Sequence, residues 1–110
     1  MATTTFSGPV VSLNGFIAGA GATITKILAG SASLNFPSIA VAGQADLTIA
    51  IPGAVVGNTV SLALPAAPAA GLTFNAFVSA TDVVTIRASN TSAAAVDAGA
   101  ATYGVIVFGV

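Results

Sequence analysis

The stretch LTIAIPGAVVGNTVSLALP (residues 47–65) decides the fold. It holds two runs in which apolar residues alternate with small or hydroxyl residues, and a turn rich in glycine and proline separates them. Alternation with a period of two is typical of β-strands that bury one face. The stretch contains no charged residue, so we interpret it as a strand pair whose polar face carries hydroxyl groups alone.

The same alternation returns along the rest of the chain. It is found in SASLNF (31–36), DLTIAI (46–51), LTFNAFV (72–78), VVTIRAS (83–89) and TYGVIVFGV (102–110). The last run is apolar on both faces, so it can bury either Tyr103, Val105 and Val107 or Ile106, Phe108 and Val110. Glycine and proline between the runs, at intervals of roughly 8 to 12 residues, are the mark of an all-β sandwich or barrel. The sequence predicts an antiparallel β-sandwich, jelly-roll or immunoglobulin-like, of about seven or eight short strands.

The first thirty residues have a different character. Isolated apolar residues are scattered among Thr, Ser and Gly, which predicts an extended arm that orders by lying against something else. We therefore divide the chain into an arm with a first hairpin (residues 1–45) and a compact sandwich (residues 46–110). Together they make one structural domain, with the boundary at Asp46.

The small number of charges excludes several kinds of partner. Only 5% of the residues are charged and the net charge is -1, whereas roughly a quarter of a typical soluble domain is charged. We expect neither nucleic acid nor a membrane as partner, because no basic surface is available for either. Residues 47–81 carry no charge, but three prolines in them would break a transmembrane helix. The first basic residue is Lys26, so no secretory signal peptide is expected.

Two residue types that are often used in catalysis are missing. The chain has no His and no Cys, which removes the usual general base and the commonest soft metal ligands. Asp46, Asp82 and Asp97 each stand at a predicted turn or strand edge, where Asp usually makes local hydrogen bonds. The segment GAGATITK (19–26) lacks the Gly-Lys-Ser/Thr ending of a phosphate-binding loop. We expect no catalytic residue, no metal and no cofactor, and the protein is predicted not to be an enzyme.

Arg87 is the charged residue with the clearest predicted role. The inward pattern of its strand turns it outward with Val83 and Thr85, within reach of a neighbouring strand. We predict a structural ion pair between Arg87 and Asp82, with Asp97 or a carboxylate of a neighbouring subunit as alternatives. A single arginine cannot form a cluster for phosphate recognition.

The apolar content points to self-association. A chain of 110 residues has a large surface for its volume and cannot hide 55% hydrophobic residues within itself. With almost no net charge, copies repel one another little. We therefore expect other copies or another protein to cover much of the surface.

Residues 47–108 resemble a small β domain that recurs in structural proteins of tailed bacteriophages. The family pattern has a PGA-x-VGDTV turn, a Pro-containing loop ending in GL, an A-x-VSA-x-DTVTVR hairpin, and N-x-T-x-x-AVDP before an aromatic residue. The matching positions are residues 52–60, 71–72, 76–87 and 90–97, and Tyr103. This chain departs from the pattern at Asn58, Val83 and Ala98, where the family has Asp, Thr and Pro. The opening FSGPVVSLNGF (6–16) is similar to the start of virion proteins of marine phages, including cyanophages.

The resemblance implies a virion structural protein. Small free-standing chains of this kind are usually capsid decoration (cement) proteins, so we expect one that binds the major capsid protein on the outer capsid surface and stabilises the head. A homotrimer is expected, because symmetric copies combine modest contacts into high avidity. The arm is expected to reach the capsid or an adjacent protomer by strand addition. Its interface residues are predicted to be Thr3, Thr5, Phe6, Pro9, Val10, Val11 and Phe16.

Two other functions remain open. The first alternative is a receptor- or glycan-binding module of a tail fibre or appendage, for which Phe74, Phe77 and Tyr103 are the candidate aromatic residues. The second is a surface-binding protein that uses threonine arrays, although the threonines do not repeat over enough strands to form a flat grid.

Overall fold

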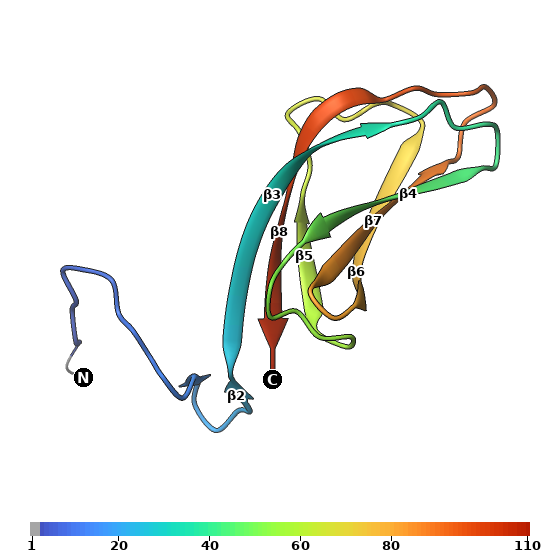
Figure 1. Ribbon diagram of the computed structural model, residues 1–110. Helices are drawn as coiled ribbons and strands as arrows, with labels where there is room; N and C mark the ends of the chain where they lie inside the picture. Colours follow the sequence, from blue (N-terminus) through green and yellow to red (C-terminus); the bar gives the residue numbers. More distant parts are fainter. Residues whose placement is uncertain (1–2) are drawn as a thin grey trace.

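The chain folds as an antiparallel β-sandwich, which confirms the predicted fold class (Figure 1). The computed structural model describes residues 3–110, and these residues form eight strands and no helix. The strands are β1 (Phe16–Ile17), β2 (Thr23–Ile24), β3 (Lys26–Phe36), β4 (Gln44–Ala50), β5 (Thr59–Ala63), β6 (Leu72–Ala80), β7 (Val83–Asn90) and β8 (Gly99–Gly109). The sandwich consists of two three-stranded sheets, β3-β8-β5 and β4-β7-β6.

Most connections carry the chain from one sheet to the other. Only β6 and β7 follow each other as a hairpin within the sandwich, while β3, β4, β5 and β6 alternate between the sheets. The interpretation of residues 47–65 as one strand pair is therefore wrong. β4 pairs with β7 and β5 pairs with β8, so the turn at 52–58 passes across the sandwich. The alternation identified both strands correctly, but it holds no information about their partners.

The core lies between the sheets and follows the predicted alternation. Leu34, Phe36, Ile49, Val84 and Ile86 are buried, and the residues between them on β3 and β4 are exposed. In the last strand the core takes Tyr103, Val105 and Val107, whereas Ile106 and Val110 are exposed.

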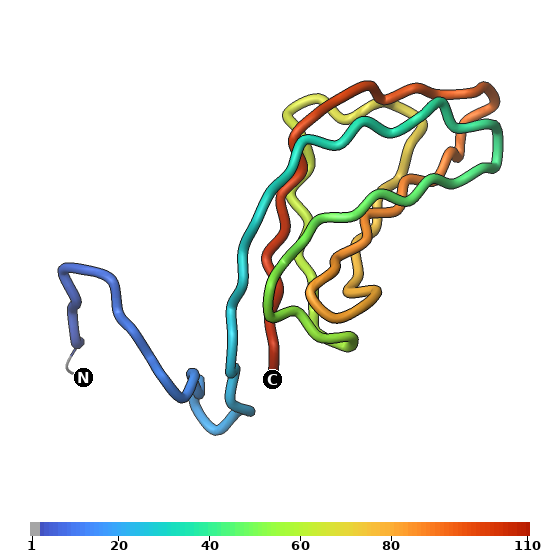
Figure 2. The backbone as a smooth tube through the Cα atoms, viewed as in Figure 1, coloured from blue at the N-terminus to red at the C-terminus, as the bar shows by residue number. Residues whose placement is uncertain are grey.

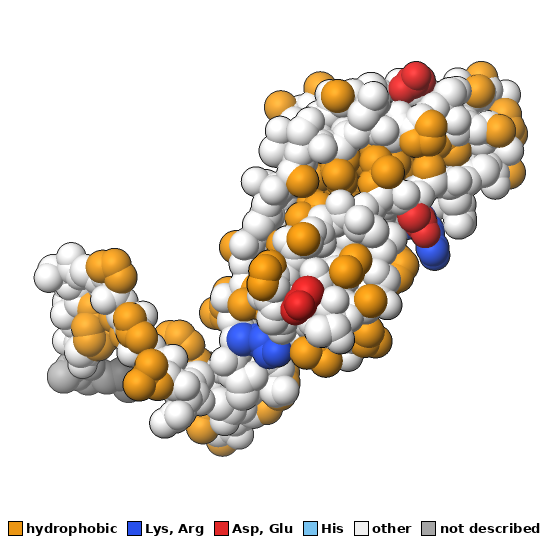
Figure 3. Space-filling view, in the orientation of Figure 1, with side chains coloured by type: hydrophobic (Ala, Val, Ile, Leu, Met, Phe, Trp, Pro, Cys, Tyr) orange, Lys and Arg blue, Asp and Glu red, His pale blue; other side chains and the backbone are white. Residues whose placement is uncertain are grey.

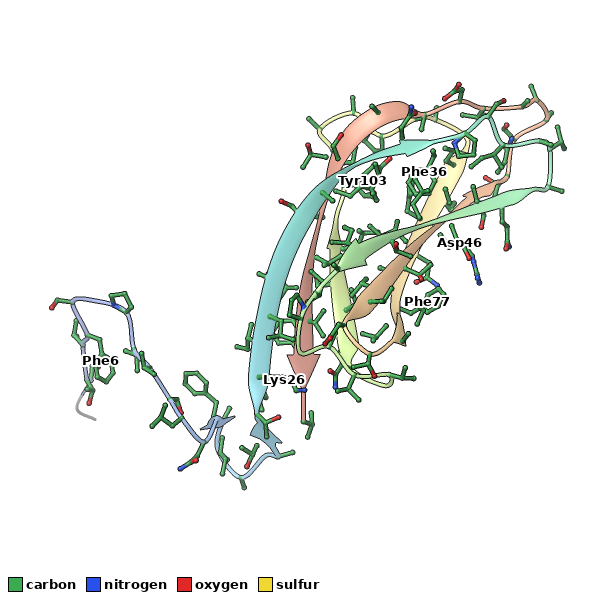
Figure 4. The ribbon with its side chains drawn as sticks, viewed as in Figure 1. Phe6, Lys26, Phe36, Asp46, Phe77 and Tyr103 are labelled. Carbon is green, nitrogen blue, oxygen red and sulfur yellow. The ribbon has the colours of Figure 1, made fainter. Side chains whose placement is uncertain are left out.

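Three aromatic rings form the upper part of the core. Phe36 and Tyr103 point between the sheets (Figure 4), and their ring centroids are 5.5 Å apart in an edge-to-face arrangement. Phe74 completes the group at 5.9 Å from Phe36 and 5.6 Å from Tyr103. Such edge-to-face pairs add roughly 0.5–1.5 kcal/mol to the free energy gained by burial.

The sandwich begins earlier in the chain than the boundary set at Asp46. Strand β3 is paired with β8 along its whole length, from Lys26↔Gly109 to Phe36↔Gly99. Residues 26–45 therefore belong to the sandwich, and the arm with its small hairpin covers only residues up to 25. The predicted boundary was placed too late in the chain because the high glycine content of the arm continues into β3 at Gly30.

The first part of the chain projects from the sandwich as an arm, as predicted. β1 and β2 form a small hairpin, with two residues in each strand, at the foot of β3. The residues before this hairpin run away from both sheets (Figure 2). The molecule measures 56 × 28 × 24 Å, with a radius of gyration of 17.3 Å. A compact domain of this length would have a radius of gyration of about 13 Å. The arm accounts for the elongation.

Candidate interaction surfaces

The arm carries the largest group of uncovered apolar side chains. Val11 is 82% exposed and Leu13 is 91% exposed, and Phe6, Val10, Phe16 and Ile17 are all more than half exposed. Phe6 lies near the end of the arm that is farthest from the sandwich (Figure 4). All seven predicted interface residues lie in this region and are exposed: Thr3, Thr5, Phe6, Pro9, Val10, Val11 and Phe16. Leu13 and Ile17 share this property and were missed, although their residue types would have justified including them.

The arm changes direction at Gly15. This residue has a φ of 90° and lies against the carbonyl group of Ile24, where a side chain would collide. The Ser12 hydroxyl donates a hydrogen bond to the Gly15 carbonyl oxygen. Glycine is the residue that adopts this backbone conformation without strain. The arm therefore leaves the β1–β2 hairpin at a defined corner.

The outer face of the β3-β8-β5 sheet has a shallow hollow of about 440 Å³. It is centred on Gly104 of β8, which is flanked by Ser31 of β3 and Ala63 of β5. All three side chains are small or absent, so the sheet backbone is open to close approach. No charged side chain lines the hollow.

The outer face of the β4-β7-β6 sheet holds the ion pair of Arg87. Arg87 Nε and Nη2 donate to the two carboxylate oxygens of Asp46, at 2.8 and 2.9 Å. Asp46 lies directly opposite Arg87 in the β4–β7 register, and the guanidinium carbon stands 5.2 Å from the centre of the Phe77 ring. The hydrogen bond from Arg87 lowers the pKa of Asp46, and that of Arg87 is raised by the same contact. Both side chains remain about 40% exposed, at 39% and 42%.

The predicted pairing of Arg87 with Asp82 is therefore wrong. Asp82 lies in the two-residue turn between β6 and β7, with a φ of 65°. Its carboxylate accepts a hydrogen bond from the Gly53 amide at 2.7 Å, and its backbone bonds to Ile51 and Ala54. Asp82 thus clamps the turn after β4 to the turn after β6. The error arose because the cross-strand neighbour of Arg87 depends on which strands pair, and the sequence does not give this.

The other aspartate behaves as predicted. Asp97 accepts a hydrogen bond from the amide of Gly99, two residues later, which is a local Asx turn. The three carboxylates stand apart, and residues 3–110 contain no cluster of three potential metal ligands. No helix long and apolar enough to cross a membrane occurs within the same range.

The aromatic residues considered for glycan binding are not gathered on one surface. Tyr103 is 1% exposed, and burial raises the pKa of its hydroxyl. Phe74 packs against it in the core, and Phe77 stands beside Arg87 on the outer face of the second sheet. Only Phe77 is therefore placed near polar side chains on a sheet surface.

A buried polar residue that the sequence analysis did not single out holds the loop before β8. Asn90 is 3% exposed, and its amide nitrogen donates to the carbonyl oxygens of Ile39 and Ala94, both at 2.8 Å. Its side-chain oxygen accepts from the amide and the hydroxyl of Ser92, at 2.9 and 2.7 Å. Asn90 is a structural residue, since every hydrogen-bonding group of its side chain is satisfied within the protein.

Comparison of the chain with protein-family models, with curated proteins and with solved structures gave no match.

Proposed function

We propose that this protein is a virion structural protein, a head decoration or cement protein that binds the outer surface of an assembled capsid as a homotrimer. The observation that carries the proposal is the exposed apolar arm, residues 3–17, which projects from a complete sandwich and contributes nothing to its core. The resemblance of residues 47–108 to structural domains of tailed phages is the reason for proposing a virion as the location.

The arm is suited to adhesion. Each large apolar side chain that moves from water into a contact contributes roughly 1.5–3 kcal/mol before the cost of ordering. The arm residues before Lys26 carry no charged side chain, so no charge has to be desolvated when they bind. Many such contacts on symmetric copies raise the barrier to rupture of the shell.

The rest of the surface is consistent with this role. Charged side chains occupy only a few small spots on the face shown in Figure 3, and apolar side chains are spread over the rest of it among uncharged groups. A surface with so few charges gives weak repulsion between copies and suits close packing on a lattice. The partner in this proposal is the major capsid protein, and the site of action is the outside of the virion head.

Co-sedimentation tests the proposal. The purified chain is mixed with capsids that lack it and pelleted at high speed, beside a variant without residues 1–15 as the matched control. The proposal predicts saturable, stoichiometric pelleting of the full chain and at least tenfold weaker binding of the shortened one. A full chain that stays in the supernatant at every concentration, or binds a glycan array and not capsids, would contradict the proposal.

A further inference from the structure

We propose that the free edge of β3 is a docking site for the arm of a second copy, which adds to the β3-β8-β5 sheet as a fourth strand. This inference rests on the homotrimer of the proposed function and deepens it, because it names the contact between copies, which needs no capsid.

Strand β3 is an unprotected edge. Within residues 3–110 its only strand partner is β8, and no backbone hydrogen bond joins β3 to any other segment. Its eleven residues pair with β8 without a register shift, and Lys26 at the foot is its only charge. A long, regular edge whose single charge lies at one end is a template for pairing with another chain along the rest of its length.

The other three edge strands each have a feature that hinders pairing. β5 is five residues long and is soon followed by Pro65. β6 has a register shift between Val78 and Ala80. β4 carries the charged Asp46 near its centre. The contrast selects β3, since bulges, charges, prolines and short length are the devices that keep edges from pairing.

An apolar strip lies beside this edge. The inward-facing Leu28 and Ala32 of β3 and Ala45 and Leu47 of β4 are only partly buried, although they pack on the core. We call these four residues the β3–β4 seam. Apolar side chains are visible on the surface between the two strands (Figure 3). A strand added to β3 would place every second side chain over the seam.

The arm has the pattern that this edge requires. Val11 and Leu13 are two residues apart, so in an extended strand both side chains point to the same face. Pro9 is two residues before Val11, so the backbone nitrogens of Pro9, Val11 and Leu13 lie on the same edge of the strand. Because proline has no N–H to donate, this edge must face away from the partner strand. The amides of Val10, Ser12 and Asn14 would then face β3, while Val11 and Leu13 cover the seam.

A second copy is the occupant because the arm turns away from its own β3. Before the corner at Gly15 the arm runs away from the sheets, and Phe6 lies far from β3 (Figures 2 and 4). Val10 and Ser12 meet only the foot of β3, where they line a hollow with Lys26 and Ile27. If the β1–β2 register were instead continued, Leu13 would stand opposite Ile27 of the same chain. Contacts from each arm to the next copy are heterologous, and three of them can close a ring.

Cross-linking between two different variants distinguishes an arm that pairs with β3 of a second copy from an arm that pairs with β3 of its own chain. The chain has no cysteine, so single thiols can be placed cleanly. Chains carrying Val11→Cys are mixed with chains carrying Ala32→Cys and treated with a short bis-maleimide. The matched control replaces Ala32→Cys with Ala76→Cys, a partly buried alanine on the β6 edge. The inference predicts mixed dimers at least tenfold more abundant with Ala32→Cys than with the control. Equal yields with Ala32→Cys and Ala76→Cys would overturn it. A chain that carries both Val11→Cys and Ala32→Cys would also overturn it if it cross-links only within itself and never to a second copy.

Hydrogen exchange and a charge substitution give independent readouts. The inference predicts slowed exchange at Val10, Ser12 and Asn14 in the associated state, and fast exchange at Val11 and Leu13. Leu13→Asp should weaken association at least tenfold by sedimentation velocity, and Asn14→Asp, on the opposite face, should have a smaller effect. Both residues are exposed in the single chain, so neither change disturbs its fold. Uniform exchange along residues 10–14, or equal effects of the two substitutions, would contradict strand addition. Failure of capsid binding alone would leave these results unchanged, so the two proposals are tested separately.

Discussion

At the scale of single residues, Asn90 is the polar side chain on which the fold depends most. Replacing it with Ala removes four hydrogen bonds at once: the Ser92 amide and hydroxyl lose their acceptor, and the carbonyl oxygens of Ile39 and Ala94 each lose one of two donors. We expect Asn90→Ala to lower the free energy of unfolding by about 2–3 kcal/mol, because unmade buried hydrogen bonds cost the full desolvation of the groups. Urea denaturation measures this change. Asn35→Ala, at an exposed position, is the control and should shift stability by less than about 0.5 kcal/mol.

The Asp46–Arg87 pair predicts a specific dependence on pH. Its hydrogen bonds lower the pKa of Asp46 in the folded state, so its contribution to stability is present above the unfolded value of about 3.9. The contribution is lost as the pH falls through the lowered folded pKa. Arg87→Gln removes the cause, and the pKa of Asp46 should rise. An NMR titration of the side-chain carboxyl carbon in both proteins tests this, and an unchanged pKa would show that the pair is not formed in solution.

At the scale of elements, Asp82 joins the turn after β4 to the turn after β6, which are far apart along the chain. Asp82→Ala removes the acceptor of the Gly53 amide and places Ala at a φ of 65°, so we expect a loss of about 1–2 kcal/mol in unfolding free energy. Asp82→Asn keeps an acceptor oxygen and a residue that tolerates this backbone conformation. In thermal unfolding, the melting temperature of Asp82→Asn should be well above that of Asp82→Ala. Equal losses would mean that the carboxylate oxygen does not hold the turn.

The elements themselves could be predicted from the sequence, and their partners could not. Alternation identified the strands because one face of each is buried, as Leu34 and Phe36 are on β3. Pairing is set by which sheet edge each strand meets, and the 52–58 turn, which crosses between the sheets, has the same residue types as a hairpin turn. The exposed arm was predictable from its glycine content and isolated apolar residues. The Asp46 partner of Arg87 and the unprotected edge of β3 emerged only with the β4–β7 and β3–β8 registers.

At the scale of the whole molecule, the sandwich should be stable without its arm. The core and the hydrophobic residues packed against it all lie after Lys26, the first of them being Leu28. We expect a chain that lacks residues 1–22 to fold, with an unfolding free energy within about 1 kcal/mol of the full chain. Urea denaturation at a concentration where both chains are monomeric measures this. A shortened chain that fails to fold would show that the arm is part of the domain.

We propose that this molecule is an assembly subunit whose exposed arm becomes covered when it binds. Electron cryo-microscopy of capsids incubated with the protein tests it most directly. The account predicts density for the sandwich on the outer capsid surface, with residues 3–17 ordered against a neighbouring copy or the shell. Capsids without added density, beside a dispersed monomer whose arm stays exposed to water, would contradict it.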